Sequence, residues 1–365
     1  MKEVEIVVDK RISDRKIEHL KIPVKADVQH KHNYFRNIKL IHYALPDHDL
    51  EEIDISVDFF SKKVSAPICI AGMTGGHPIA KDINAILAKA AEKENIILGV
   101  GSQRAGIEEI FKDSYKIIRE KAPNIPIIGN LGIGQVSSKS FKNDIFQKCI
   151  SMIDADAMAI HFNALHELLQ DGGNTSFKLF NKHFQTIREE FSLPIIAKET
   201  GNGFNKEIVN KLEILGFDGF DVGGLGGTSF AAIESERNNN VNKNYTRNPA
   251  VLFRDWGIPT PISILNVREV SEKMIISTGG LRSGIDIIKS IALGANIGGI
   301  AFNFLISAWK DYQQKSTMNT IREIRTLKNE IRSTLWLINI KNINELIGNK
   351  NKIVLFGDLY QWINQ

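Results

Sequence analysis

Short runs of apolar residues recur along the chain, and each ends in glycine, polar or charged residues. Runs of this length are typical of strands that are buried on both faces, as in parallel sheets. They lie at residues 67–71, 96–100, 126–130, 156–160, 194–198, 217–221, 274–278 and 297–301. The pattern therefore predicts eight buried strands.

The segments between these runs carry apolar residues at helical spacing. One such face is formed by Ile79, Ile83, Ile86, Leu87 and Ala90, and another by Ile208, Leu212 and Leu215. Gly216 follows the second face directly and is placed to end that helix. Strands that alternate with helices predict a (β/α)₈ TIM barrel, with a doubly wound open sheet as the alternative.

The unusual residues lie at the carboxyl ends of the predicted strands. They occur in the motifs GMTGG, GSQR, GNLG, HFN, KETGNG, GGLGGT, GGLRSG and AFN. Active sites occupy this face of TIM barrels, so the placement favours the barrel over the open sheet.

One domain is predicted for residues 1–365. Residues 1–60 would form an N-terminal cap, residues 61–310 the barrel, and residues 311–365 C-terminal helices that close its outer ring. Residues 236–245 are rich in asparagine and interrupt the alternation, which indicates a mobile loop or an insertion.

The composition fits a soluble globular protein, with 43% hydrophobic residues and a net charge of +4 over 365 residues. This charge is too small to indicate nucleic-acid binding. No apolar run reaches the ~18 residues of a membrane span, and the charged N-terminus lacks a signal-type apolar core. A cytoplasmic location is therefore expected. Cys69 and Cys149 are interpreted as buried apolar side chains, not as a disulfide or a nucleophile.

Two glycine-rich loops follow the sixth and seventh predicted strands, DVGGLGGTSF and STGGLRSG. Glycine lets backbone N–H groups approach an anion closely, and barrels commonly hold a phosphate at their last loops. The two loops, with Arg282 in the second, predict a phosphate-bearing cofactor. Tight turns without a ligand are the alternative for each loop taken alone.

Lys198 ends the fifth predicted strand, where an unpaired ammonium group would be costly. It would stabilise an electron-rich ring or form a Schiff base. The alternative is an ion pair with Glu199 or Asp221.

After the fourth predicted strand, His161 is a candidate general acid, base or anion donor. Glu167 is a candidate ligand of a divalent cation, or an acid favoured by a helix N-terminus. Arg15, Lys16, His19 and Arg104 would together bind a diphosphate, although each alone is typical of a surface charge.

Nine motifs occur in one order: RKIEH, AGMTGG, GVGSQR, GNLG, HFN followed by an acid, KETGNGF, GGLGGTSFAAIE, DWGIPTP and STGGLRSGIDIIKSIALGA. In this order the chain resembles the type 2 isopentenyl-diphosphate delta-isomerases, the FMN-dependent family of archaea and many bacteria. The resemblance extends from about Arg15 to the C-terminal helices. It implies a TIM barrel that isomerises isopentenyl diphosphate to dimethylallyl diphosphate without net redox change.

The resemblance also implies roles for individual residues. FMN would contact Ala71, Gly72, Met73, Thr74, Ser102, Asn130, Lys198, Gly223, Thr228, Gly279, Gly280, Leu281, Arg282, Ala301 and Phe302. The prenyl diphosphate would contact Arg15, Lys16, His19, Ser102, Gln103, Arg104, His161, Asn163 and His166. Glu167 would bind Mg²⁺, and His161, His166 and Lys198 would be catalytic. NADPH would reduce the flavin, and a homotetramer or homo-octamer is expected.

The chain departs from the family pattern at three positions. His166 stands where the family usually has glutamine, Gly223 where many relatives have serine, and Ala164 where proline or a large apolar residue is frequent. Histidine hydrogen-bonds like glutamine and can also titrate, so we expect isomerase activity with an altered pH dependence. A comparison of pH–rate profiles with His166→Gln tests this.

Two other functions are compatible with such a barrel. One is an FMN-dependent oxidoreductase of the α-hydroxy-acid oxidase type, although no histidine follows Arg282 closely. The other is a non-catalytic barrel that binds flavin or prenyl phosphates. A nucleotide dehydrogenase of the IMP type would need a loop cysteine, which the sequence lacks.

Overall fold

The computed structural model describes residues 17–109, 111–170, 172–237 and 248–364. Arg15, Lys16 and most of the asparagine-rich segment therefore lie outside the described residues. No helix within these ranges is long and apolar enough to cross a membrane.

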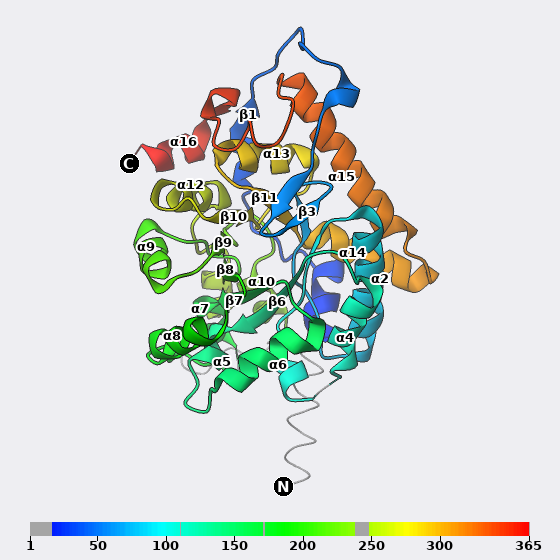
Figure 1. The fold of residues 1–365 in the computed structure, drawn as a ribbon. Helices are drawn as coiled ribbons and strands as arrows, with labels where there is room; N and C mark the ends of the chain where they lie inside the picture. Colours follow the sequence, from blue (N-terminus) through cyan, green and yellow to red (C-terminus); the bar gives the residue numbers. More distant parts are fainter. Residues whose placement is uncertain (1–16, 110, 171, 238–247, 365) are drawn as a thin grey trace.

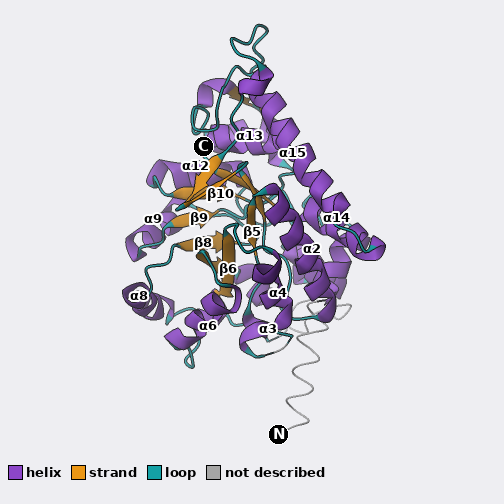
Figure 2. Ribbon diagram, turned by 45° about the vertical axis from the view of Figure 1, so that its right-hand side comes forward, coloured by secondary structure: helices purple, strands orange, loops and turns teal. Residues whose placement is uncertain are grey.

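A closed barrel of parallel strands occupies the centre of the molecule (Figures 1 and 2). The strands are β4 (Ile68–Ile70), β5 (Ile97–Gly99), β6 (Ile127–Gly132), β7 (Ala157–Phe162), β8 (Ile195–Glu199), β9 (Gly219–Asp221), β10 (Met274–Ser277) and β11 (Ile297–Ile300). They follow chain order around the barrel, and β11 pairs with β4 to close it, with Gly299 opposite Cys69. The predicted TIM barrel is confirmed, and the open-sheet alternative is wrong.

A ring of helices surrounds the strands (Figure 2). It consists of α2 (Pro78–Glu94), α4 (Asp113–Lys121), α6 (Asn143–Ile153), α8 (Phe180–Glu190), α9 (Lys206–Leu215), α12 (Thr260–Val270), α13 (Gly284–Leu293) and α14 (Phe302–Gln314). The apolar faces predicted for α2 and α9 are confirmed, because Ile83, Leu87 and Leu212 are buried in the main core. Gly216 ends α9 with φ 95°, a left-handed conformation that glycine adopts without strain.

Shorter helices lie in the loops at the carboxyl ends of the strands and carry several side chains of the site described below. These helices are α3 (Arg104–Ile107), α5 (Ile133–Val136), α7 (Ala164–Leu169), α10 (Phe230–Arg237) and α11 (Pro249–Leu252). The last two flank the asparagine-rich segment at residues 236–245.

The N-terminal segment reaches both ends of the barrel. Residues 17–25 are helical, and Gln29 forms a β-bridge with Thr228 in the loop after β9. The hairpin β2 (Val57–Phe59) and β3 (Lys62–Val64) directly precedes β4 and packs Phe59 and Val64 into the main core. This segment therefore contributes to the barrel mouth and also to the opposite end.

The C-terminal segment is not purely helical. The predicted boundary at residue 310 falls inside α14, and α15 (Met318–Leu337) packs against α2, α13 and α14. Beyond it, β12 (Ile353–Leu355) pairs antiparallel with β1 (Ile38–Leu40) near the end of the chain. The 3₁₀ helices η1 (Tyr34–Asn37), η2 (Leu50–Glu52) and η3 (Lys350–Lys352) and the terminal helix α16 (Gly357–Ile363) complete these segments.

The two cysteines lie where the sequence suggested. Cys69 is in β4 and Cys149 in α6, and both are buried and free. Burial raises the pKa of each thiol to about 12, which keeps them protonated and unreactive.

Candidate functional site

A cavity of about 270 Å³ opens at the carboxyl ends of the barrel strands. Each strand or the loop after it contributes to the lining. These residues are Ala71, Ser102, Asn130, His161, Lys198, Gly223, Thr278 and Ala301. His19 and Leu20 from the helix at residues 17–25 line the same cavity, so the N-terminal segment forms one of its walls.

The two glycine-rich loops lie backbone to backbone at this cavity. A Cβ atom on Gly279 would lie 2.2 Å from the Gly224 carbonyl oxygen, and one on Gly280 would lie 2.7 Å from that of Gly226. Gly279 and Gly280 also have φ of 101° and 91°, which L side chains rarely adopt. Glycine is needed here because the two loops approach each other closely, and the predicted approach to an anion stays a prediction.

Helix α14 begins beside these loops without a side-chain cap, and Ala301 and Phe302 at its start line the cavity. The first N–H groups of a helix have no partner within it, and the helix dipole favours an anion there. Gly280 and Leu281 line the same region. The arrangement fits a phosphate group held by backbone donors.

Arg282 is held at the edge of this region by its neighbours. Its guanidinium lies 5.0 Å from the centre of the Phe302 ring and donates to the side-chain oxygen of Gln29. Gln29 in turn donates to the Thr228 hydroxyl at 3.1 Å. Gln29 thus links the two predicted cofactor residues Arg282 and Thr228, and no local pattern in the sequence indicated this role.

Lys198 forms an ion pair with Asp221, with 2.6 Å between Nζ and Oδ2. The side chains are only 13% and 10% exposed, and the other Asp221 oxygen accepts the Thr278 hydroxyl. The ion pair considered as the alternative role of Lys198 is therefore observed, with Asp221 as the partner. Lys198 also lines the cavity.

Glu199, which also lines the cavity, binds the loop that follows it. Its Oε2 accepts backbone N–H groups from Thr200, Gly201, Asn202 and Gly203 at 2.5–3.0 Å. Burial raises the pKa of Glu199 to about 7, although these four hydrogen bonds act in the opposite direction. The carboxyl group organises the KETGNG loop, a role that the motif alone did not reveal.

His161 on β7 is oriented by Asn130 on β6, with 2.7 Å between Nδ1 and Oδ1. The amide group of Asn130 donates to the Val100 carbonyl at 3.0 Å, so its oxygen faces the ring. The imidazole Nδ1 must therefore donate, and in the neutral ring Nε2 carries the lone pair. Gln103 helps to position Asn130, because the Gln103 side-chain oxygen accepts the backbone N–H of Asn130.

Glu167 on α7 faces the cavity with both oxygens engaged. Oε1 accepts the Asn163 side-chain amide at 3.0 Å and Oε2 accepts the backbone N–H of Asn174 at 2.6 Å. The Asn163 side-chain oxygen is buried without a hydrogen-bond partner among the described residues. A carboxylate beside an unsatisfied amide oxygen offers the oxygen ligands that Mg²⁺ prefers.

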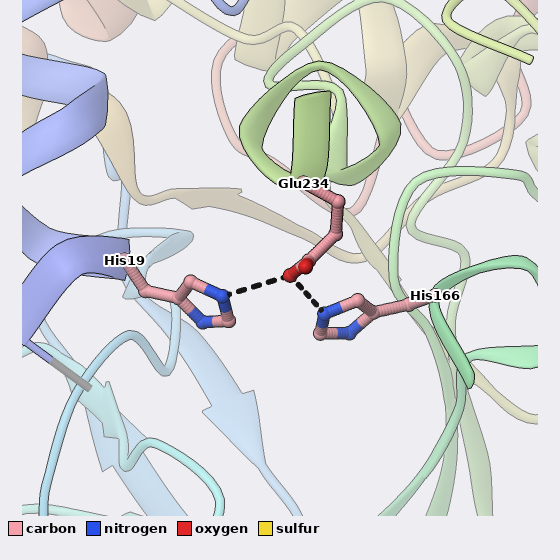
Figure 3. A group of neighbouring side chains, drawn as sticks. All are labelled: His19, His166 and Glu234. Carbon is pink, nitrogen blue, oxygen red and sulfur yellow. Dashed lines mark hydrogen bonds and ion pairs between the residues drawn. The ribbon is translucent and has the colours of Figure 1, made fainter. Parts of the chain in front are cut away.

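His19 and His166 line a third part of the cavity wall, and their rings converge on Glu234 (Figure 3). Glu234 on α10 places its carboxylate between the two rings, at 3.1 Å from His19 and 3.0 Å from His166. Arg237 donates to both oxygens of this carboxylate. Burial lowers the pKa of His19 to about 4, so this ring is neutral at physiological pH.

Comparisons with known proteins agree with this architecture. A family model described as FMN-dependent dehydrogenase matches residues 10–122. The isopentenyl-diphosphate delta-isomerase of Archaeoglobus fulgidus is 40% identical over 353 residues, covering 96% of this chain and 98% of the relative. That of Pyrococcus abyssi is 41% identical over 360 residues, covering 96% and 94%. This chain belongs to the isopentenyl-diphosphate delta-isomerase family.

More distant solved structures share the fold alone with this isomerase-family chain. A flavocytochrome b2 variant with bound pyruvate has a TM-score of 0.64 at 18% identity, covering 91% of this chain and 78% of its own. Mandelate oxidase with benzoyl-formic acid has a TM-score of 0.58 at 13% identity, covering 86% of each chain. The resemblance drawn from the motifs is thus confirmed at the level of the family.

The structure brings most of the residues implied by the family resemblance to one cavity. Those on its wall are His19, Ala71, Gly72, Met73, Ser102, Arg104, Asn130, His161, Asn163, His166, Glu167, Lys198, Gly223, Thr228, Gly279, Gly280, Leu281, Arg282, Ala301 and Phe302. Thr74 and Gln103 do not line it. Thr74 is buried, and the Gln103 amide donates to the Cys149 carbonyl at 2.8 Å. Gln103 is fully buried and contacts the site through the backbone N–H of Asn130, so its predicted contact with the substrate stays a prediction.

Two residues of the site, Gln29 and Glu234, had no role assigned from the sequence, and Glu199 and Asp221 were named only as possible partners of Lys198. Glu234 ends the motif GGLGGTSFAAIE, where an acid at the end of an apolar helical turn was the available signal. Asp221 ends the sixth strand, as Lys198 ends the fifth, and β8 pairs with β9 at these two residues.

Substitution of Gly223 tests whether the close contact between its backbone and that of Glu199 requires glycine. Its φ is 44°, and an added Cβ would lie 1.9 Å from the Glu199 carbonyl oxygen. Gly348 is also left-handed, with φ 69°, but nothing lies within 4 Å of its Cβ position. We expect Gly223→Ala to lower the free energy of unfolding by about 1–3 kcal/mol more than Gly348→Ala, because only Gly223 must displace backbone. Equal losses in urea titrations would contradict this.

Glu199 should make stability depend on pH. Burial raises its pKa to about 7 in the folded protein, against an ordinary value of 4.5 for a solvated glutamate. Between pH 4.5 and pH 7 the Glu199 carboxyl is ionised in the unfolded chain but still protonated in the folded protein. The free energy of unfolding therefore falls as the pH rises through this range, and the contribution of the protonated carboxyl is lost by about pH 7. Glu199→Gln mimics the neutral acid and should remove up to about 3 kcal/mol of this dependence.

Urea unfolding of the wild type and Glu199→Gln at pH 5 and pH 8 measures the effect. The variant should gain stability relative to the wild type at the higher pH. Parallel pH dependences of the two proteins would show that the folded-state pKa of Glu199 is not raised.

Proposed function

We propose that this protein isomerises isopentenyl diphosphate to dimethylallyl diphosphate with FMN as its cofactor. The observation that carries the proposal is a single cavity that joins two kinds of site. One side is a glycine-rich backbone cradle beside the start of α14, and the other holds His161, Asn163 and Glu167. The near-full-length similarity to curated isomerases supports the same reaction.

The cradle fits the phosphate of FMN, because it offers backbone donors where any Cβ would collide with a neighbouring loop. Gly279, Gly280, Leu281 and Phe302 would hold that phosphate. The ring would lie toward Lys198, whose charge is balanced by Asp221 and can stabilise an electron-rich flavin. Reduced FMN, when bound, supplies the acid and base for the proton shift, and NADPH would reduce it.

Arg104 and His161 would bind the substrate diphosphate, together with Ser102, Arg15 and Lys16. Glu167 and Asn163 would hold Mg²⁺ against the diphosphate oxygens. The reaction adds one proton to an unactivated alkene and removes another, so a dry, charge-balanced pocket is needed. The helix at residues 17–25 provides the apolar wall, with Leu20 and Pro23 on the cavity.

The test is anaerobic incubation of the full chain with isopentenyl diphosphate, FMN, NADPH and Mg²⁺. Dimethylallyl diphosphate should form, and omission of FMN or of a reductant should abolish product. Replacement of NADPH by dithionite should restore activity, since only the reduced flavin is needed. Bound flavin without product would contradict the proposal. Flavin reduction by lactate or mandelate would instead support the α-hydroxy-acid oxidase alternative.

The homotetrameric or homo-octameric assembly and the cytoplasmic location stay predictions. Size-exclusion chromatography with light scattering tests the first.

A further inference from the structure

The cluster of His19, His166 and Glu234 has the composition of a metal site. One atom from each side chain can serve as a ligand, and these atoms all lie within 4.8 Å of one another. The side chains come from three segments, the helix at residues 17–25, α7 and α10, and converge on one point (Figure 3). Such convergence from distant parts of the chain is what a polydentate site requires.

The distances suit a transition-metal ion. Nε2 of His19 and Nε2 of His166 contact the same oxygen of Glu234, Oε1, at 3.1 and 3.0 Å. Metal–ligand bonds of about 2.0–2.2 Å place neighbouring ligand atoms roughly 3 Å apart. An ion can therefore replace the two hydrogen bonds with small rotations of the rings.

The groups around the cluster hold Glu234 in place and set the local charge. Arg237 contacts Oε2 at 2.7 Å and donates from Nε to Glu18 at 2.9 Å. Glu18, Glu234 and Arg237 together carry one net negative charge, which favours a dication.

Aromatic packing orients His166. Its ring stacks on Phe230, with 5.0 Å between ring centres and 28° between planes. His19, His166 and Glu167 all line the cavity. The Glu167 carboxylate accepts from Asn163 and Asn174, and it is not part of the group of three ligand side chains.

We propose that His19, His166 and Glu234 bind a divalent transition-metal ion of the Zn²⁺ class, with its open coordination positions toward the cavity. Two imidazoles and one carboxylate select Zn²⁺, Co²⁺ or Fe²⁺ over Mg²⁺. The histidine at position 166 supplies the second nitrogen in this chain. Occupation of the site narrows the cavity and inhibits turnover, a consequence that rests on the proposed isomerase function.

Equilibrium dialysis of the full chain with FMN tests binding without turnover. We expect one Zn²⁺ per chain, retained in excess Mg²⁺, and an intense visible Co²⁺ spectrum typical of tetrahedral coordination. His166→Gln and Glu234→Gln should each raise Kd more than about 100-fold, because loss of a ligand costs more than loss of an outer partner. Glu167→Gln, and His42→Gln at an exposed position, should keep the wild-type Kd.

Equal Zn²⁺ affinity of the wild type and both cluster variants, each with native circular dichroism and flavin content, would overturn the site. Inhibition has its own measurement: Zn²⁺ at the dialysis Kd should halve the wild-type rate and EDTA should restore it. Zn²⁺ binding to a chain that never forms dimethylallyl diphosphate would support the metal site and count against the isomerase function alone.

Discussion

Asp221→Asn should lower the free energy of unfolding by about 3–5 kcal/mol, because it leaves the Lys198 ammonium buried without an anion. The pair is almost fully enclosed, with 2.6 Å between Nζ and Oδ2 and exposures of 13% and 10%. Such a site cannot solvate the ammonium well once its partner is neutral. Urea unfolding of the purified chain at pH 7 measures the change.

The matched control is the double variant Lys198→Met with Asp221→Asn. Removal of both charges leaves no unpaired ion, so the double variant should be more stable than Asp221→Asn alone. A loss below about 1 kcal/mol in Asp221→Asn would place the pair among solvated surface ion pairs and contradict its buried geometry.

The barrel was predictable from the sequence because its strands carry a local signal. Each strand is a short apolar run buried on both faces, such as β4, in which Ile68, Cys69 and Ile70 are all buried. Helix ends are similarly local, as with Gly216 after α9. The periodicity also placed the site, because the carboxyl ends of parallel barrel strands meet at one face.

Pairings between distant segments were not predictable in this way. Strand β12 lies more than 300 residues after β1, and neither strand is longer than three residues. Their pairing depends on how the N- and C-terminal segments fold around the barrel. The sequence therefore predicted helices for the whole C-terminal segment and missed the strand.

The site likewise combines residues that a local motif predicted with residues that only the fold brings into place. Lys198, His161 and the glycine-rich loops were found from motifs, because each has a chemical signature within a few residues. Gln29 and Glu234 were missed, because they contact cavity residues from distant segments of the chain. Glu234 lies 68 residues from His166 and 215 from His19, so only the fold brings the three together.

His161 shows how a partner defines a chemical role. Asn130 fixes the Nδ1 proton through a bond of 2.7 Å, and Gln103 fixes the Asn130 backbone at 2.9 Å. The hydrogen bonds that link Gln103, Asn130 and His161 determine which nitrogen of the His161 ring can accept a proton or contact an anion. This explains how the buried Gln103 influences the cavity without lining it.

His161→Ala should lower kcat/KM for isopentenyl diphosphate by about 10²–10⁴-fold, the range for loss of a positioned acid–base or anion-binding group. FMN content should stay near that of the wild type, because the cradle at Gly279, Gly280 and α14 is unchanged. Anaerobic initial rates, with flavin absorbance as the measure of loading, give the result. His183→Ala is the matched control, since His183 contacts the Val136 carbonyl outside the cavity. If both variants retained wild-type rates at full flavin loading, His161 would have no part in the reaction.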